Sequence, residues 1–145
     1  AVTVSPTEEQ LEQIHTLGFD YVQIHGKISE KLLSECKTPV IRAINVSGIE
    51  SIGDIENLDN VKGILFDSAV PGSGKSFDWS MLEKLPKNQK MLFLAGGLTA
   101  DNVAKAVAQV RPFAVDVSSG VELADKSGKD FELVRAFIEN ARNSK

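Results

Sequence analysis

The sequence alternates short, continuously apolar segments with helical patterns, and this alternation restricts the fold more than any other feature. The apolar segments, short enough for β-strands, are residues 1–4, 21–24, 40–44, 63–66, 91–95 and 113–117. A segment with helical periodicity follows each of them, and these segments are residues 6–17, 29–36, 48–57, 79–85, 100–109 and 130–141. Strands that are apolar throughout are typical of a parallel sheet with both faces covered. The pattern therefore predicts six consecutive βα units with right-handed crossovers.

Six units fit neither common architecture of this kind. A flavodoxin-like open sheet has about five units, whereas a closed (β/α)8 barrel has eight. Eight units of this length would need about 190 residues, near the lower end of the barrel class, and the chain has 145. The length predicts a single domain over residues 1–145, two units short of a barrel.

Two of the expected helices have start signals in the sequence. Ser5 is placed to cap the first helix, with Pro6 at the first helical position and Glu8 completing a capping box. Thr99 is placed to cap the fifth helix in the same way. These signals fix where both helices are expected to begin.

Composition excludes several functional classes. The net charge is −4, with 42% hydrophobic and 25% charged residues, and no basic patch stands out, so neither nucleic acid nor a membrane surface is an expected partner. No apolar run approaches the length of a membrane span. Cys36 is the only cysteine, which excludes an internal disulfide and a multi-cysteine metal site and fits a cytoplasmic protein.

The residues that follow the strands predict a ligand-binding edge, because ligands gather at the carboxyl ends of parallel strands in both architectures. These ends are rich in Gly, Ser, Asp and His, and the opposite ends are not. They read Ser5-Pro6, Gln23-Ile24-His25-Gly26, Asn45-Val46-Ser47-Gly48, Asp67-Ser68, Ala95-Gly96-Gly97 and Asp116-Val117-Ser118-Ser119-Gly120. This asymmetry favours a catalytic or binding protein over a purely structural one.

The last two strand ends favour phosphate binding. Glycine-rich turns that lead into helix starts expose backbone N–H groups, which bind phosphate oxygens with the help of the helix dipole. The segments 94–103 and 116–122 have this composition, and in barrels the phosphate site follows the last two strands. The alternative is that the glycines only permit tight turns, but two such loops in succession favour the phosphate interpretation.

A loose P-loop match at residues 69–76 does not indicate an NTPase. In a true P-loop the Gly-Lys-Ser runs directly into a helix whose first N–H groups hold the phosphates. Here Phe77 and Asp78 intervene, Asp78 is the better helix cap, and Pro71 removes one N–H donor. The match is interpreted as a coincidence.

Three of four further side chains have two interpretations each. Asp67 either caps a turn or acts as a general acid, because apolar neighbours at 64–66 favour the neutral form of a carboxyl group. His25 either binds a ligand or packs in a turn. Arg42 either binds an anion from within its strand or extends into solvent. The fourth side chain, His15, has a single interpretation and is expected to face solvent from its helix.

Taken together, five motifs resemble those of the phosphoribosylanthranilate isomerase family, in order and in spacing, along the whole chain. They are VQIHG (22–26), PVIRAI (39–44), ILFDS with GSGKSFDW (64–79), LAGGLTADNV (94–103) and VDVSSGVE with GKD (115–130). The resemblance implies a TIM-type (β/α)8 barrel that catalyses an Amadori rearrangement in tryptophan biosynthesis, an aldose–ketose isomerisation. The substrate would be N-(5-phosphoribosyl)anthranilate, with no cofactor and no metal.

The resemblance also assigns roles to residues. Asp67 resembles the general acid that protonates the ribose ring oxygen and opens the ring. Asp116 resembles a residue near the sugar hydroxyls, and Gln23 and His25 resemble a pair that lines the substrate site. Residues of the last two strand ends resemble the phosphate site, and a further loop resembles one that covers the substrate. The phosphate residues are Gly96, Gly97, Ser118, Ser119 and Gly120, and the covering loop contains Gly72, Ser73 and Gly74.

The chain also departs from the family pattern. The family begins with two further βα units, whose first strand carries a Lys-x-Cys-Gly motif with the general-base cysteine. Cys36 lies at the end of the second helix and is not expected to replace it, and the family arginine for the anthranilate carboxylate is also unmatched. The resemblance therefore implies the last six of eight units, inactive alone. The alternative function is that of a non-catalytic barrel subdomain, a folding unit or weak phosphate binder.

Without the first two family units, residues 1–4 and 113–117 are expected to form unpaired sheet edges. Open edges pair with other chains, so three outcomes are expected. The chain associates with itself, the first and sixth strands meet in a rearranged closure, or an N-terminal barrel fragment complements the chain.

Overall fold

The protein is described by a computed structural model that covers residues 1–45, 58–67, 78–84 and 90–144. Within these residues, six strands form one parallel sheet in the order of the chain. They are β1 (Val2–Val4), β2 (Val22–His25), β3 (Val40–Asn45), β4 (Val61–Asp67), β5 (Met91–Leu94) and β6 (Ala114–Val115). The six strands predicted from the apolar segments are all confirmed.

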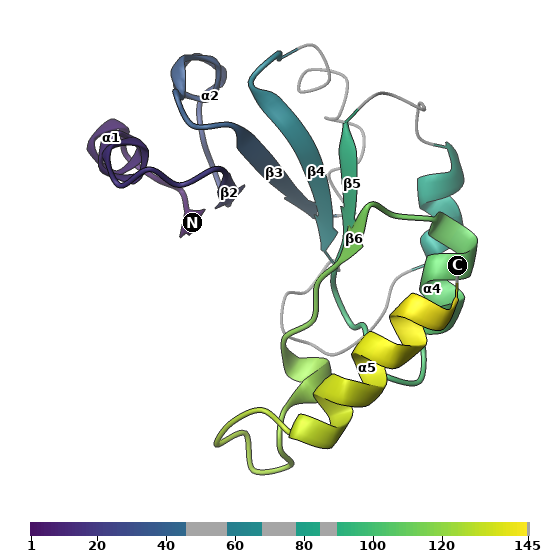
Figure 1. Ribbon diagram of the computed structural model, residues 1–145. Coiled ribbons are helices and arrows are strands. Elements are labelled where there is room, and N and C mark those ends of the chain that lie inside the picture. Colours follow the sequence, from purple (N-terminus) through teal and green to yellow (C-terminus); the bar gives the residue numbers. More distant parts are fainter. Residues whose placement is uncertain (46–57, 68–77, 85–89, 145) are drawn as a thin grey trace.

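The sheet is an open arc, with β1 at one edge and β6 at the other (Figure 1). The α/β class and the incomplete barrel predicted from the sequence are confirmed. Closure between the first and sixth strands, one of the three expected outcomes, is wrong, because the described strands run in order from β1 to β6 and no pairing joins β1 to β6. Strands of three and two residues offer few ladder hydrogen bonds to offset the bending that closure requires.

Four α-helices and two 3₁₀ helices lie beside the sheet in the described residues. They are α1 (Glu8–Thr16), α2 (Glu30–Glu35), η2 (Trp79–Lys84), α4 (Val103–Val110), η3 (Ser119–Val121) and α5 (Phe131–Asn143). The helix expected at 48–57 lies outside the described residues. The helix expected at 79–85 is a 3₁₀ turn that starts after Asp78, whose carboxylate accepts the Ser80 amide at 3.0 Å. Asp78 therefore caps this segment, as the sequence predicts.

Helix α1 begins two residues later than its first start signal suggests. Thr7 is the N-cap, and a capping box joins it to Gln10, whose amide oxygen accepts the Thr7 N–H at 2.9 Å. Ser5 instead has a left-handed backbone (φ 48°), and its hydroxyl accepts the Lys27 N–H at 2.9 Å. The sequence contains two overlapping capping patterns, and the contact with the loop after β2 uses the first serine. The prediction that Ser5 caps the helix was therefore wrong.

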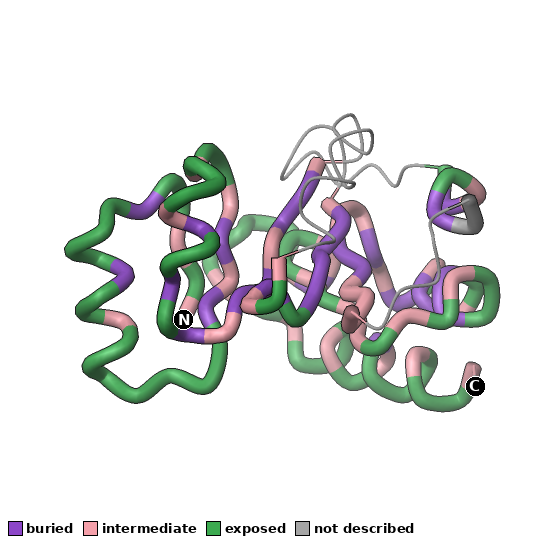
Figure 2. Tube along the Cα trace, turned by 90° about the horizontal axis from the view of Figure 1, so that it is seen from above, coloured by how far each residue is buried: buried purple, intermediate pink, exposed green. Residues whose placement is uncertain are grey.

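The helices cover one face of the sheet, and a smaller apolar cluster lies on the other. On the helix side, one cluster joins α1 and α2 to β2 and β3, and a larger one joins η2, α4 and α5 to β4 and β5. On the opposite, inner face, Ile41, Ala43, Leu65 and Ala95 form a third cluster. Figure 2 shows the buried residues concentrated in the strands and the inward sides of the helices. No helix in the described part of the chain is long and apolar enough to cross a membrane.

Candidate functional site

Strand alternation places Asp67 on the inner face of the sheet. Successive side chains of a strand point to opposite faces, so Asp67 shares its face with Leu65, which belongs to the inner cluster. Ile64 and Phe66 belong to the helix-side core, so only one of the three apolar neighbours shares the face of the carboxyl group. Asp67 is half-buried at the carboxyl end of β4, in register with Asn45 of β3.

A cavity of about 310 Å³ lies at the carboxyl ends of β4, β5 and β6. Among the residues that the structure describes, its walls contain seven of the site residues predicted from the sequence, together with five others. The predicted ones are Asp67, Gly96, Gly97, Asp116, Ser118, Ser119 and Gly120, and the others are Ala95, Leu98, Val117, Glu122 and Lys126. The two glycine-rich loops and the strand-end carboxyl group therefore meet in one hollow.

The β5 loop, residues 95–99, depends on two consecutive left-handed glycines. Gly96 has φ 76° and Gly97 has φ 70°, a conformation that costs other residues about 1 kcal/mol or more. Asn102 braces the turn, because its side chain accepts the Thr99 N–H and donates to the Gly97 carbonyl, both at 2.9 Å. The predicted Thr99 side-chain cap was wrong, since Thr99 contributes only its carbonyl to α4.

The β6 loop, residues 116–120, packs directly against the β5 loop. A Cβ atom at Gly120 would overlap the carbonyl oxygen of Leu98, so only glycine permits this approach. Asp116 begins the loop, and its N–H donates to the Leu94 carbonyl at 2.8 Å. The two loops therefore form one rigid wall of the cavity.

Gln23 and His25 lie together on the inner face of β2 but outside this cavity. Their Nε2 atoms are 2.9 Å apart, as expected for residues i and i+2 of a strand. In the sheet, β3 lies between β2 and β4, so the pair is about 10 Å from the Asp67 strand at normal strand spacing. A ligand that contacts both groups must extend across the inner face.

Arg42 is structural. Its guanidinium donates to the carbonyl oxygens of Ile24 (2.7 Å), Ala43 (2.8 Å) and Gly26 (2.6 Å). It is in register with Ile24 and Ile64, which pack on the helix side. Extension of Arg42 into solvent was therefore wrong, because three backbone carbonyls hold its guanidinium beside the sheet. Anion binding by Arg42 stays a prediction.

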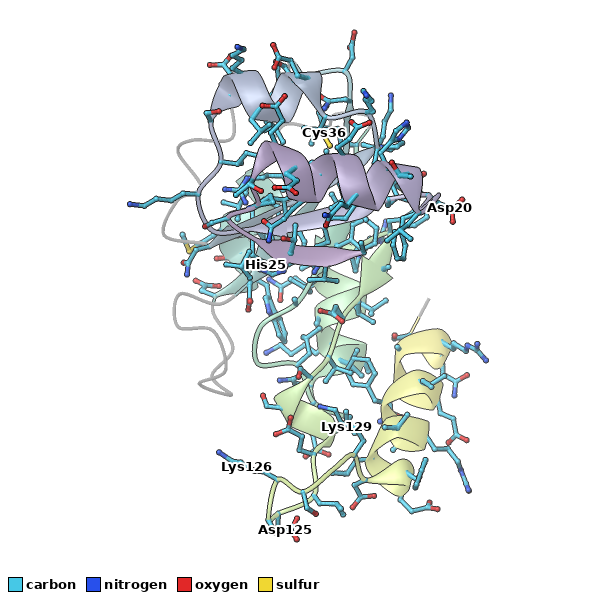
Figure 3. The ribbon with its side chains drawn as sticks, turned by 90° about the vertical axis from the view of Figure 1, so that its left-hand side faces the viewer. Asp20, His25, Cys36, Asp125, Lys126 and Lys129 are labelled. Atoms are coloured by element: carbon cyan, nitrogen blue, oxygen red, sulfur yellow. The ribbon has the colours of Figure 1, made fainter. Side chains whose placement is uncertain are left out.

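Cys36 lies in the outer layer, as predicted. It is buried in the cluster of α1, α2 and β2, and its thiol donates to the Thr38 carbonyl at 3.4 Å. Burial raises the pKa of the Cys36 thiol. Figure 3 shows Cys36 beside α1 and α2, far from Lys126 and Lys129 below. His15, on α1, is exposed as predicted.

Sequence reasoning missed three residues of this region. Glu122 and Lys126 line the cavity, and Asn102 holds the β5 loop. The signal for the first two was the charged segment directly after the β6 loop. The loop with Gly72, Ser73 and Gly74 lies outside the described residues. In the described part of the chain, no group of three or more His, Cys, Asp or Glu side chains is arranged to hold a metal ion.

Comparisons with known proteins agree on one family. The family model described as N-(5′-phosphoribosyl)anthranilate (PRA) isomerase matches residues 2–140. A curated N-(5′-phosphoribosyl)anthranilate isomerase of Streptococcus mutans is 43% identical over 143 residues, which are 97% of this chain and 70% of the relative. A Streptococcus pneumoniae isomerase is also 43% identical, with 98% of this chain and 68% of the relative covered.

Solved structures agree with these relatives. A phosphoribosyl anthranilate isomerase from Thermotoga maritima superimposes with a TM-score of 0.82 at 36% identity, covering 98% of this chain and 71% of that one. A phosphoribosyl anthranilate isomerase in complex with reduced 1-(o-carboxyphenylamino)-1-deoxyribulose 5-phosphate gives 0.79 at 34% identity, with 98% and 70% covered. A 3-hexulose-6-phosphate synthase from Salmonella typhimurium, 13% identical with a TM-score of 0.70, shares the fold alone.

Proposed function

The chain belongs to the N-(5′-phosphoribosyl)anthranilate isomerase family, and on this premise we propose that its site binds N-(5′-phosphoribosyl)anthranilate for an Amadori rearrangement. The product would be 1-(o-carboxyphenylamino)-1-deoxyribulose 5-phosphate, whose reduced form is bound in one structurally similar isomerase. The observation that carries the proposal is the cavity at the ends of β4, β5 and β6, which joins Asp67 to both glycine-rich loops.

The phosphate group is proposed to bind between the β5 and β6 loops. Backbone N–H groups of such turns are pre-organised donors for phosphate oxygens. Gly96, Gly97 and Gly120 let the two loops approach each other and the ligand closely. Ser118 and Ser119 are exposed at the cavity wall, where their hydroxyl groups are available as further donors.

Asp67 is proposed as the general acid. Asp67 and Asp116 line the same cavity from strands two positions apart, so the strand spacing of the sheet separates them by about 10 Å. A phosphate bound at the β6 loop therefore leaves the sugar ring over β5, within reach of Asp67. Protonation of the ring oxygen by Asp67 breaks its bond to C1 and leaves a Schiff base between C1 and the anthranilate nitrogen.

The second half of the reaction needs a base at the sugar C2. Loss of the C2 proton gives an enol, and tautomerisation places the carbonyl at C2, so C1 is reduced as C2 is oxidised within one molecule. Cys36 is the single cysteine of the sequence and is buried in the outer layer. The family resemblance assigns the base to a strand that these 145 residues do not contain. We therefore expect the chain alone to bind the ligand without turning it over.

A second candidate function is a non-catalytic barrel subdomain. The observation that favours it is the open inner face, where Val2 and Val4 are 69% and 70% exposed at the β1 edge. In this role the chain is a folding unit that awaits a complementary N-terminal fragment or a second copy. One structurally similar protein is a monomer generated from a dimeric phosphoribosylanthranilate isomerase of Thermotoga maritima. A cytoplasmic location stays a prediction from the cysteine content.

A complementation assay tests the isomerase proposal. The chain is assayed with N-(5′-phosphoribosyl)anthranilate alone and together with the first two βα units of the Streptococcus mutans relative, with substrate and product separated by chromatography. We expect no turnover by the chain alone and measurable turnover by the mixture. Asp67→Asn should lower turnover of the mixture by a factor of about 10² to 10⁴ because it removes the acid.

Asp59→Asn is the matched control, because Asp59 is exposed at the amino end of β4, opposite the cavity. This variant should retain the turnover of the unaltered mixture. Turnover by the chain alone would contradict the expectation that it lacks the general base. Full activity of the Asp67→Asn mixture would overturn the role of Asp67. If neither phosphate nor the reduced product binds to the chain, the subdomain function is favoured instead.

A further inference from the structure

A small hairpin over residues 122–129 closes one side of the cavity. Glu122 and Lys129 form an antiparallel bridge, and the Leu123 N–H donates to the Gly128 carbonyl at 3.0 Å. The turn is tightened by a bond of 2.8 Å from the Lys126 N–H to the Leu123 carbonyl. Lys126 is left-handed, with φ 59°. The hairpin follows the β6 loop directly, so its tip is held beside the proposed phosphate site.

The ionisable groups around the cavity are mostly acidic. Asp67, Asp116 and Glu122 line it, whereas Lys126 is the single cation among the described lining residues. A phosphate monoester carries a charge of about −1.5 to −2 at neutral pH. Backbone N–H groups supply partial charges only, so a full positive charge nearby strengthens the binding of a dianion beside Asp116 and Glu122.

Lys129 does not supply this charge, because other groups already hold its ammonium. Its Nζ lies 2.9 Å from a Glu122 carboxylate oxygen, and it donates to the Ser118 carbonyl at 2.8 Å. Lys129 is thus neutralised, and it ties the hairpin to the β6 loop. Within the part of the chain that the structure describes, no carboxylate pairs with the Lys126 side chain. In Figure 3, Lys126 extends from the hairpin on the side away from α5.

We propose that Lys126 binds the phosphate group of the ligand and provides the charge that selects a phosphorylated sugar over its unphosphorylated form. The Lys129–Glu122 pair and the bond to Ser118 hold the hairpin against the β6 loop, which keeps Lys126 in the cavity wall. This inference rests on the proposed phosphate site, and it adds to the backbone N–H groups a side chain that discriminates by charge.

Titration with inorganic phosphate, followed by the backbone amide signals of Gly96, Gly97 and Gly120 in NMR spectra, tests the inference. Lys126→Gly removes the cation, and because glycine adopts φ 59° without strain, it leaves the hairpin conformation intact. We expect this variant to bind phosphate about fivefold more weakly at low ionic strength, the effect of one exposed ion pair. High salt should reduce the difference between the variant and the wild type.

Two further variants complete the test. Lys126→Arg keeps the charge and should retain affinity within a factor of about two. Lys62→Gly removes an exposed lysine at the second position of β4, about 16 Å from Asp67 at the rise of a strand, and should leave phosphate affinity unchanged. If the wild type binds and Lys126→Gly binds equally well, the role of Lys126 is overturned while the proposed site stands. If the amide signals of the two loops do not shift in the wild type, both the role of Lys126 and the proposed phosphate site are wrong.

Discussion

At the residue scale, Arg42 joins the ends of two strands. Its guanidinium satisfies three carbonyl oxygens, of Ile24, Gly26 and Ala43. Burial lowers the pKa of the Arg42 guanidinium, but arginine stays protonated in proteins. Arg42→Met should therefore destabilise the fold by about 2–3 kcal/mol, because it leaves these acceptors without a donor. Urea unfolding followed by circular dichroism measures the change.

Lys62→Met is the matched control for Arg42→Met, because it removes an exposed cation from the neighbouring strand β4. It should change the unfolding free energy by less than about 0.5 kcal/mol. Equal effects of the two substitutions would show that the carbonyl contacts of Arg42 contribute nothing.

Residue-level features were predicted well where chain neighbours determine them. The strand-end position of Asp67 followed from the apolar run before it, and the glycine loops followed from their composition. Arg42 and Asn102 could not be assigned in this way. Two of the three partners of Arg42, Ile24 of β2 and Gly26 directly after it, are 18 and 16 residues away in the chain, and only the register of β2 with β3 brings them to Arg42.

At the scale of an element, the tip of the 122–129 hairpin is expected to respond to acid through Asp125. The Ser127 N–H, at 3.0 Å, and then the Ser127 hydroxyl, at 2.7 Å, donate to Asp125 Oδ1 and lower the pKa of that carboxyl group. A lowered folded-state pKa means that the contribution to stability is present at neutral pH and is lost as the pH falls through that pKa. Acid should therefore open the hairpin tip before the sheet unfolds.

Amide hydrogen exchange at Ser127, followed by NMR through the acidic range, measures this opening. Protection of the Ser127 N–H should fall with acidification, while protection in β3 and β4 persists. In Asp125→Asn the side chain keeps an acceptor oxygen but does not titrate, so its Ser127 protection should vary much less with pH. Identical pH profiles in both proteins would exclude Asp125 as the group that responds to acid.

The presence and type of helices and strands could be predicted wherever hydrophobic periodicity and burial coincide. The residues at which they begin and end could not. Helix α1 has two overlapping capping patterns, and the contact between Ser5 and Lys27 decides which of them caps the helix. The short 3₁₀ segment after Asp78 has the composition of a helix but only six residues, too few for cooperative helix formation alone. Tertiary contacts, which a single sequence does not display, set these boundaries.

At the scale of the whole molecule, the inner face of the sheet is incomplete. Val2 and Val4 share that face with Gln23 and His25, their partners in register, and are 69% and 70% exposed. The isomerases that the chain resembles are longer, since it covers 70% of the Streptococcus mutans relative. The alternation of strands and helices predicted six βα units. The chain-order barrel sheet and its open edges at residues 1–4 and 113–117 were predicted only through the family resemblance, because alternation alone also fits an open sheet of another strand order.

The exposed edge predicts self-association of the 145-residue chain. Unpaired β1 backbone groups and two exposed valines favour pairing with a second copy, so sedimentation velocity should show a mass that rises with concentration. Val2→Lys combined with Val4→Lys should shift the protein toward monomer, because charges on an edge strand oppose pairing. Phe131 of α5 is 86% exposed, and Phe131→Lys is the control that removes a distant apolar surface without touching the edge. If the chain stays monomeric at every concentration, the prediction of self-association is wrong. If Phe131→Lys associates less than the double variant, the association does not take place through β1.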